Sequence, residues 1–440
     1  MTLVLADWLI SSADQPAQPG WGVRVVDGVV DQIGQNADLL ATYPDDDVVD
    51  AAGHIVMPGF VNAHVHLYGT LAHGIPPVEG TAPDGFWSFL EDYWWPKVED
   101  ALDIAMIEAA TDYVCAEMLR SGTTTFFDIL EAPNAIPDAL LAQKEVVERR
   151  GMRGLLSFEA TERAGVEIAR LGLEENARLI DSCNPGDLVG GLMSWHTVFT
   201  CSADYIVEAF GMATDRGVMS HAHVNEGVHE GEWAEANLGQ RTVEFYDSIG
   251  VAGPNFLASQ CVQLSDHERD LLAERDVRVT HMPLSNCEVG GGIAPMPELL
   301  DAGVTVGLGS DGYVNDFYEV MRGAFLLHKA RLQDPRAMPA ETVLEMATLG
   351  GAKALGLDRV GCLLPGWSAD LQVVDATFPT PVTQHNIADQ IVLWRNHSHV
   401  RDVMVDGLWR VRRGEVLGAD IDCLSARSRE QAVRLWECGR

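Results

Sequence analysis

The sequence predicts an α/β fold: a (β/α)8 barrel of the TIM type joined to a small β-sandwich domain that both chain ends build together. Three observations predict it. Eight apolar strand-like segments alternate with helical patterns in the middle of the chain, whereas both ends consist of short alternating segments with Asp-Gly turns. The third observation is length, because 440 residues exceed the roughly 250–300 that one hydrophobic core organises.

Residues 1–56 form the first part of the predicted small domain. Their segments alternate polar and apolar residues and break at Asp-Gly and Gly signals typical of hairpins. Residues 365–415 repeat this pattern around Asp406-Gly407. Neither end has enough strands to cover its own apolar face, so we expect the two to form one unit. Residues 416–440 are predicted to form a C-terminal helix.

The barrel is predicted over residues 57–364, because near-continuous apolar strands that alternate with helices favour a parallel sheet. A doubly wound open sheet is the alternative, but no GxGxxG or GxxxxGK[ST] loop follows a strand. The eight candidate strands are 60–66, 123–129, 153–159, 188–196, 217–224, 255–262, 277–283 and 304–312.

Composition excludes several classes of partner. The formal net charge is −35, which disfavours nucleic acids and anionic membranes, and no apolar run is long enough to cross a bilayer. The N-terminus lacks the basic segment of a signal peptide, and the eight cysteines form no CxxC pair, as in reduced cytoplasmic proteins. We therefore expect a cytoplasmic protein that acts on a small molecule.

Candidate metal ligands follow three of the predicted strands. His64 and His66 project to one side of the first strand, although such a pair alone could be two ordinary histidines. His221 and His223 end the fifth strand, and spacing does not choose between them. Asp311 follows the eighth strand, where it could instead cap a helix. Together, imidazoles and a carboxylate from three strand ends predict a divalent metal site that leaves a position open for water.

Four segments of the sequence resemble the amidohydrolase superfamily, within it the mononuclear branch of S-adenosylhomocysteine, cytosine and guanine deaminases and triazine hydrolases. These segments are MPGFVNAHVHLYG (57–69), HVNE (223–226), SNCEVGGGIAPMPELLDAGVTVGLGSDG (285–312) and DPRAMPAETVLEMATLGGAKALGLDRVGCLLPGWSADLQVVDA (334–376).

The resemblance implies a role for each site residue. His64, His66, His223 and Asp311 match the metal ligands, and Glu226 matches the carboxylate that carries a proton to the substrate ring. His196 matches a position that faces the substrate, which leaves His221 as a packed or supporting histidine. The binuclear branch bridges two metals with a carbamylated lysine, but no lysine lies between Lys144 and Lys329. We therefore expect one divalent ion, zinc on ligand type, with Fe²⁺ the alternative.

Gln260 departs from the family pattern, which has a histidine before Cys-Val on the sixth strand. An amide donates and accepts hydrogen bonds but takes up no proton near neutral pH. We expect Gln260 either to orient the attacking water or to bind the substrate. His281, at the end of the seventh strand, is the alternative residue for this position, although we expect it to be a structural histidine. In the aromatic segment 86–95 we expect Trp94 and Trp95 to be core residues and Trp87 to be available to stack on a planar substrate.

These residues predict an aminohydrolase. A divalent ion lowers the pKa of its bound water, so that hydroxide is available to attack a ring carbon that bears an amine, with Asp311 as base and Glu226 as proton carrier. The substrate is then a planar nitrogen heterocycle and ammonia is released. The alternatives are hydrolysis of another leaving group or of a ring amide at the same site, and a catalytically silent relative. We also expect a homodimer or larger homo-oligomer.

Overall fold

The computed structural model describes residues 1–76, 85–312 and 314–438. The predicted barrel is confirmed: all eight strand positions form and all pair in parallel, in the order β14-β13-β12-β11-β10-β8-β7-β6, with β9 beside β8. The strands are β6 (Phe60–Val65), β7 (Thr123–Leu130), β8 (Arg153–Ala160), β9 (Val189–Gly191), β10 (Met193–Trp195), β11 (Ser220–Val224), β12 (Phe256–Gln260), β13 (Arg278–His281) and β14 (Val306–Leu308).

The first and last strands close the barrel through their ends. Val65 forms a parallel bridge with Asp311, and the backbone amides of Ser310 and Asp311 both donate to the His64 carbonyl at 3.0 Å. Most strand residues are buried on both faces, which accounts for their near-continuous apolar runs.

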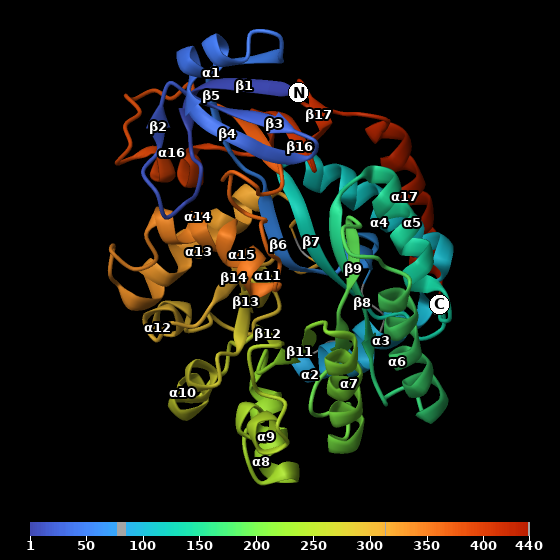
Figure 1. Ribbon diagram of the computed structural model, residues 1–440. Helices are drawn as coiled ribbons and strands as arrows, with labels where there is room; N and C mark the ends of the chain where they lie inside the picture. Colours follow the sequence, from blue (N-terminus) through green and yellow to red (C-terminus); the bar gives the residue numbers. More distant parts are fainter. Residues whose placement is uncertain (77–84, 313, 439–440) are drawn as a thin grey trace.

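Helices surround the barrel (Figure 1). A typical one, α7, begins where the Ser202 side chain accepts from the Tyr205 amide and ends at Gly217 with φ +65°. The longer helices are α4 (Ile104–Arg120), α5 (Ala139–Arg150), α6 (Val166–Asp181), α7 (Ala203–Arg216), α8 (Val228–Leu238), α10 (Asp266–Glu274) and α13 (Phe317–Leu332). The shorter ones are η1 (Leu67–Ala72), α2 (Phe86–Phe89), η2 (Leu90–Trp94), α3 (Trp95–Lys97), η3 (Glu99–Ala101), α9 (Thr242–Ser248), α11 (Pro283–Glu288), α12 (Met296–Asp301), α14 (Ala340–Met346) and α15 (Leu349–Ala354).

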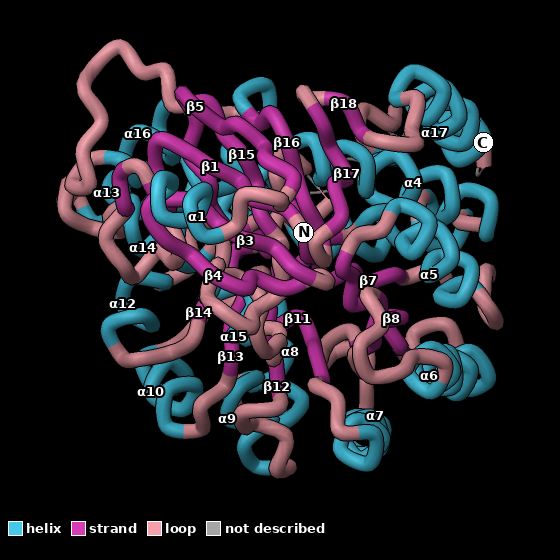
Figure 2. Tube along the Cα trace, turned by 45° about the horizontal axis from the view of Figure 1, so that its top comes forward, coloured by secondary structure: helices cyan, strands magenta, loops and turns pink. Residues whose placement is uncertain are grey.

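Both chain ends build the second sheet, as predicted, and it lies over one end of the barrel (Figure 2). Its order is β18-β17-β16-β15-β5-β1-β3-β4, with β2 beside β1, and β1 and β5 pair in parallel. The strands are β1 (Thr2–Leu9), β2 (Gln18–Pro19), β3 (Trp21–Val26), β4 (Val29–Gln35), β5 (Asp47–Pro58), β15 (Leu371–Asp375), β16 (Val400–Val405), β17 (Leu408–Arg412) and β18 (Glu415–Val416); α1 (Asn36–Thr42) follows β4.

The described strands of this unit belong to one sheet rather than to the two sheets of a sandwich. An isolated bridge between Val29 and Ser368 brings β4 back toward the segment before β15. The curled sheet therefore buries its own apolar layer, with Val4 and Val23 from one chain end and Leu371 and Met404 from the other. It needs no second sheet because opposite parts of one sheet face each other.

The described part of the C-terminal region contains the α-helices α16 (Ile387–Trp394) and α17 (Ile421–Glu437) and the short 3-10 helix η4 (His397–His399). Within 365–415, α16 packs on α13 and α14, beside η4. The helix α17 packs on α4 and η1, where Lys97 Nζ donates to the carbonyls of Trp436 and Cys438. Residues 439–440 of the predicted helix lie outside the described residues. No helix in the described ranges has both the length and the apolar character that a membrane crossing requires.

The second sheet caps the amino ends of the first barrel strands. Buried Gln372 donates to the Pro58 carbonyl at 3.1 Å and accepts from the Tyr318 hydroxyl at 2.9 Å. Between β5 and β6, a Cβ at Gly59 would lie 2.2 Å from Thr124, so only glycine allows this close crossing. The carboxyl ends of the strands at the opposite end of the barrel remain available for a site.

We predict that a fragment comprising residues 57–360 is insoluble. Removing both chain ends exposes the apolar residues at the amino end of the barrel and removes the hydrogen-bond partners that Gln372 provides. Expression beside the full chain, with soluble yield measured after centrifugation, tests this. A soluble, active 57–360 fragment would show that the barrel folds without the second sheet.

Candidate functional site

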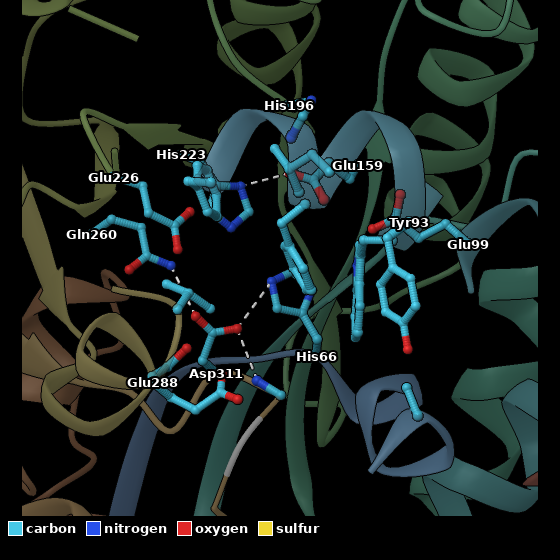
Figure 3. A pocket seen from close by; sticks show the side chains of 18 of the residues that line it. His66, Tyr93, Glu99, Glu159, His196, His223, Glu226, Gln260, Glu288 and Asp311 are labelled. Carbon is cyan, nitrogen blue, oxygen red and sulfur yellow. Dashed lines mark hydrogen bonds and ion pairs between the residues drawn. The ribbon is translucent and has the colours of Figure 1, made fainter. Parts of the chain in front are cut away.

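The carboxyl ends of the barrel strands surround a cavity of about 450 Å³ (Figure 3). Side chains from the ends of β6, β8, β10, β11, β12 and β14 meet there, beside the segment that follows β6. Of the candidate site residues predicted from the sequence, those that line the cavity are His66, His196, His223, Glu226, Gln260 and Asp311.

Three histidines converge beneath this cavity. His64, His66 and His223 each bring one ring nitrogen within 4.8 Å of the others. The His66 Nδ1 lies 2.7 Å from the Ile129 carbonyl, which accepts its proton and leaves Nε2 unprotonated toward the cluster. The two nitrogens of His64 are buried and have no hydrogen-bond partner among the described residues.

This arrangement fits a divalent metal ion. Burial lowers the pKa of His64 well below its ordinary value, which favours the neutral form that binds metals. A buried imidazole with unpartnered nitrogens is costly unless something coordinates them. Three imidazoles beside one carboxylate form a typical donor set for zinc or a similar ion.

Asp311 lies beside the histidine cluster in an uncommon backbone conformation, with φ +58°. Its Oδ1 lies 3.5 Å from His66 Nε2 and accepts from the Gly312 amide at 2.8 Å, while Oδ2 accepts from Gln260. Burial alone would raise the pKa of Asp311, but His66 and His64 outweigh it and hold the pKa below its ordinary value. The carboxylate is therefore ionised.

Sequence reasoning did not identify Glu159, the residue that positions His223. Its Oε1 lies 2.6 Å from His223 Nδ1, so that Nε2 faces the other histidines. Glu159, His196 and His223 also bring one ligand atom each within 4.8 Å of one another. The sequence did offer one indication of this role, because Glu159 is an acidic residue at the end of the third predicted strand. Burial lowers the pKa of His196 to about 3, so this ring is neutral at the cavity wall.

His221 is fully buried beside Ser194 Oγ, which lies 3.2 Å from its Nδ1. Its ring packs on Phe127 with the centroids 5.0 Å apart, and it belongs to neither cluster of potential ligands in the described chain. The structure therefore places His223, and not His221, among the potential metal ligands, a choice that spacing alone left open.

Glu226 lines the cavity as a buried carboxyl group. Burial, and then the charge of Asp311, raise its pKa to about 8. Two neighbouring carboxyl groups thus differ in protonation near neutral pH: Asp311 is ionised and Glu226 carries a proton. Such a pair can provide a base and an acid in one site.

Gln260 contacts Asp311 directly. Its Nε2 donates to Asp311 Oδ2 at 2.9 Å, and its Oε1 accepts from Asn286 Nδ2. Both ends of the amide thus contact protein groups. His281 does not replace it, because the His281 ring is buried against His328, with the two Nε2 atoms 3.0 Å apart.

The aromatic wall differs from the sequence expectation. Trp87 is not among the described residues that line the cavity; its indole stacks on His229 with ring centroids 4.3 Å apart. Trp94, expected in the core, lines the cavity, while Trp95 is buried as expected. The missed signal is helical spacing, because the lining residues lie at i, i+3, i+4, i+7 and i+8: Phe86, Phe89, Leu90, Tyr93 and Trp94.

In the described part of the chain, six carboxyl groups line the cavity beside four histidines, and burial raises the pKa of Glu226 and Glu230 to about 8 and about 7. No lysine or arginine is among the described residues that line it. One of the carboxylates, Glu99, accepts from the Tyr68 hydroxyl at 3.0 Å and pairs with Arg163 behind the wall. The lining carboxylates are Glu99, Glu159, Glu226, Glu230, Glu288 and Asp311.

Comparison with known proteins identifies the family to which this sequence is similar. The sequence matches the amidohydrolase family over residues 55–410. It is 35% identical over 391 residues to a 5'-deoxyadenosine deaminase of Methanothermobacter thermautotrophicus, covering 88% of each chain. It is also 35% identical over 397 residues to a 5-methylthioadenosine/S-adenosylhomocysteine deaminase of Pelotomaculum thermopropionicum, covering 88% of this chain and 87% of the relative.

A solved structure of a deaminase has the same fold. An adenosine deaminase from Xanthomonas campestris with bound zinc superposes with a TM-score of 0.88 at 26% identity, covering 99% of this chain and 98% of that one. The family match covers most of the sequence, and the relatives match nearly their whole length. With its barrel, its histidine cluster and its paired carboxyl groups, this chain belongs to the amidohydrolase family.

Proposed function

We propose that this enzyme hydrolyses the exocyclic amine of the adenine ring in a nucleoside that carries no phosphate, and releases ammonia. The observation that carries the proposal is the cavity, which combines an aromatic wall and paired acid and base carboxyls with a carboxyl-rich lining in which the described residues include no lysine or arginine. The names of the relatives support it, since they differ in the 5' substituent and share adenine. An acidic wall disfavours an anionic phosphate group.

One zinc ion completes the proposed site, held by His64, His66, His223 and Asp311. When bound, the ion lowers the pKa of a water molecule and polarises the reacting carbon. The bound zinc of the Xanthomonas structure supports this choice of metal. The absence of lysine between Lys144 and Lys329 supports a single ion.

The protein's own groups move the protons. The ionised Asp311 accepts a proton from the attacking water, and Glu226, with its pKa raised to about 8, delivers one to the ring nitrogen beside the reacting carbon. Water thus supplies the new carbonyl oxygen, one proton for the ring nitrogen and one for the departing amine.

The remaining site residues position the substrate and the catalytic groups. His196, neutral at the wall beside Glu159, faces the substrate, and rings such as Trp94 and Phe89 cover the flat base and exclude water. We propose that Gln260 orients Asp311 and does not bind the substrate, because both ends of its amide already contact protein groups. Trp87 supports the wall through its stacking on His229.

A cytoplasmic location and a homo-oligomeric state belong to the same proposal. The location is supported by the eight cysteines, all of which are free thiols. Size-exclusion chromatography with light scattering tests the oligomeric state.

We expect ammonia release from 5'-deoxyadenosine and 5'-methylthioadenosine, with kcat/KM on the order of 10²-fold or more higher than for adenosine 5'-monophosphate, because the phosphate would face carboxylates. Coupled ammonia assays on matched nucleoside and nucleotide pairs measure this ratio. Equal turnover of the nucleotide would contradict the charge argument. Chloride release from a chlorotriazine without ammonia release from any nucleoside would favour the alternative hydrolysis.

Glu226→Gln should lower kcat by roughly 10²–10⁴ while leaving the zinc content near that of the wild type, because the amide keeps the shape but carries no transferable proton. Steady-state kinetics and elemental analysis are the measurements. Glu232→Gln, at an exposed position on helix α8, which follows Glu226, is the matched control. Loss of zinc in Glu226→Gln would instead make Glu226 a ligand.

Asp311→Ala should lower both the zinc content and the activity, because it removes the only carboxylate proposed to bind the ion and the proposed base. Elemental analysis of the wild type should give about one zinc per chain, as expected for a single tetrahedral shell. Asp270→Ala, at an exposed position, controls for the loss of one acidic residue. Two zinc ions per wild-type chain would overturn the assignment of a single ion.

A further inference from the structure

A chain of two amides leads from helix α11 to Asp311. Asn286 Nδ2 donates to Gln260 Oε1, and Gln260 Nε2 donates to Asp311 Oδ2 at 2.9 Å. Asn286 and Gln260 are both almost fully buried, at 1% and 0% exposure. Figure 3 marks the second of these contacts, where Gln260 faces Asp311.

The direction of these hydrogen bonds follows from the chemistry of their last member. An ionised carboxylate only accepts, so Gln260 must present its NH₂ group to Asp311. Its carbonyl oxygen then faces Asn286, and residue 286 must be a donor. Leucine or aspartate at this position would leave the buried Gln260 oxygen without a donor, which costs free energy.

Backbone geometry aims both side chains at this meeting point. Gln260 and the following Cys261 have φ of +72° and +51°, a left-handed pair that is uncommon for residues with a side chain. The Cys261 amide donates to the Val224 carbonyl at 2.9 Å and holds this turn against β11. On the other side, the Asn286 amide donates to the Met282 carbonyl at 3.1 Å within α11.

We infer that Asn286 is a positioning residue that fixes the orientation of the Gln260 amide, and that the two act as one unit to hold Asp311 toward the histidine cluster. This inference rests on the proposed function only in taking Asp311 as a ligand of the metal ion. Partners of ligands orient them, and their removal weakens metal binding by about 10–100-fold. Asn286 contributes through Gln260, so its effect should vanish when Gln260 is absent.

The test is a double-mutant cycle in zinc affinity, measured on the full-length protein by competition with a chelator. Asn286→Ala and Gln260→Ala should each weaken zinc binding by about 10–100-fold, and the double variant should be no weaker than Gln260→Ala. Gln372→Ala is the matched control, because this buried amide bonds Pro58 and Tyr318 at the opposite end of the barrel. It should combine additively with Gln260→Ala.

Asn286→Asp keeps the shape of the side chain and tests the hydrogen-bond direction. The new carboxyl group only accepts once it is ionised, and burial raises the pKa of such a group, so zinc affinity is compared from about pH 7 to about pH 10. In the ionised form Gln260 would turn its NH₂ group toward residue 286 and its oxygen toward Asp311. Zinc affinity and kcat should fall at least as far as in Asn286→Ala, with KM changed much less. Thermal unfolding in excess chelator separates this effect from loss of folding.

Two results would overturn the inference: additive effects of Asn286→Ala and Gln260→Ala on zinc affinity, or unchanged zinc affinity in a folded Asn286→Asp. Failure of the proposed function would look different. The wild type would release no ammonia from any nucleoside while the coupling between residues 286 and 260 persisted. Ammonia release together with additive variants would leave the function standing and remove only the inference.

Discussion

The backbone amides of Ser310 and Asp311 both donate to the His64 carbonyl and join the last barrel strand to the first. This closure brings the proposed ligands together, because His64 and His66 come from β6 and Asp311 follows β14 at the opposite end of the sequence order. The left-handed backbone of Asp311 allows the chain to bond His64 and still turn its carboxylate toward His66. The histidine cluster and Asp311 therefore meet at this junction, at the edge of the cavity.

The closed barrel also gives the two carboxyl groups, Asp311 and Glu226, different pKa values. Asp311 lies against histidines that hold its pKa low, whereas burial and the charge of Asp311 raise the pKa of Glu226 to about 8. One environment thus provides an ionised base and the other a protonated acid at the same pH, which hydrolysis of an exocyclic amine requires. The second sheet packs at the far end of the barrel without occupying the site.

The amide pair of Asn286 and Gln260 shows how a chain can keep an active-site geometry while changing one of its groups. An imidazole can exchange a proton, whereas two amides in series only orient what they contact. Buried polar groups of this kind are effective only when each one is satisfied, which ties Gln260 to a donor from a separate helix.

By itself, the sequence determined the barrel, the origin of the second sheet in both chain ends, and the candidate ligands His64, His66 and His223. The barrel, the second sheet, His64 and His66 follow from strand periodicity and from the i, i+2 spacing of side chains on a strand, which are local properties. Spacing left His221 and His223 open, and only the resemblance to the amidohydrolase superfamily selected His223. Only the tertiary structure decided that Glu159 pairs with His223, that Asn286 contacts Gln260, and that one curled sheet replaces a sandwich. It also turned Trp94 rather than Trp87 toward the cavity. The contacts of Glu159 and Asn286 join residues far apart in the sequence, which no local pattern encodes. Helical spacing groups the cavity-lining residues of segment 86–95, but only the tertiary structure decides that this face of the segment turns toward the cavity.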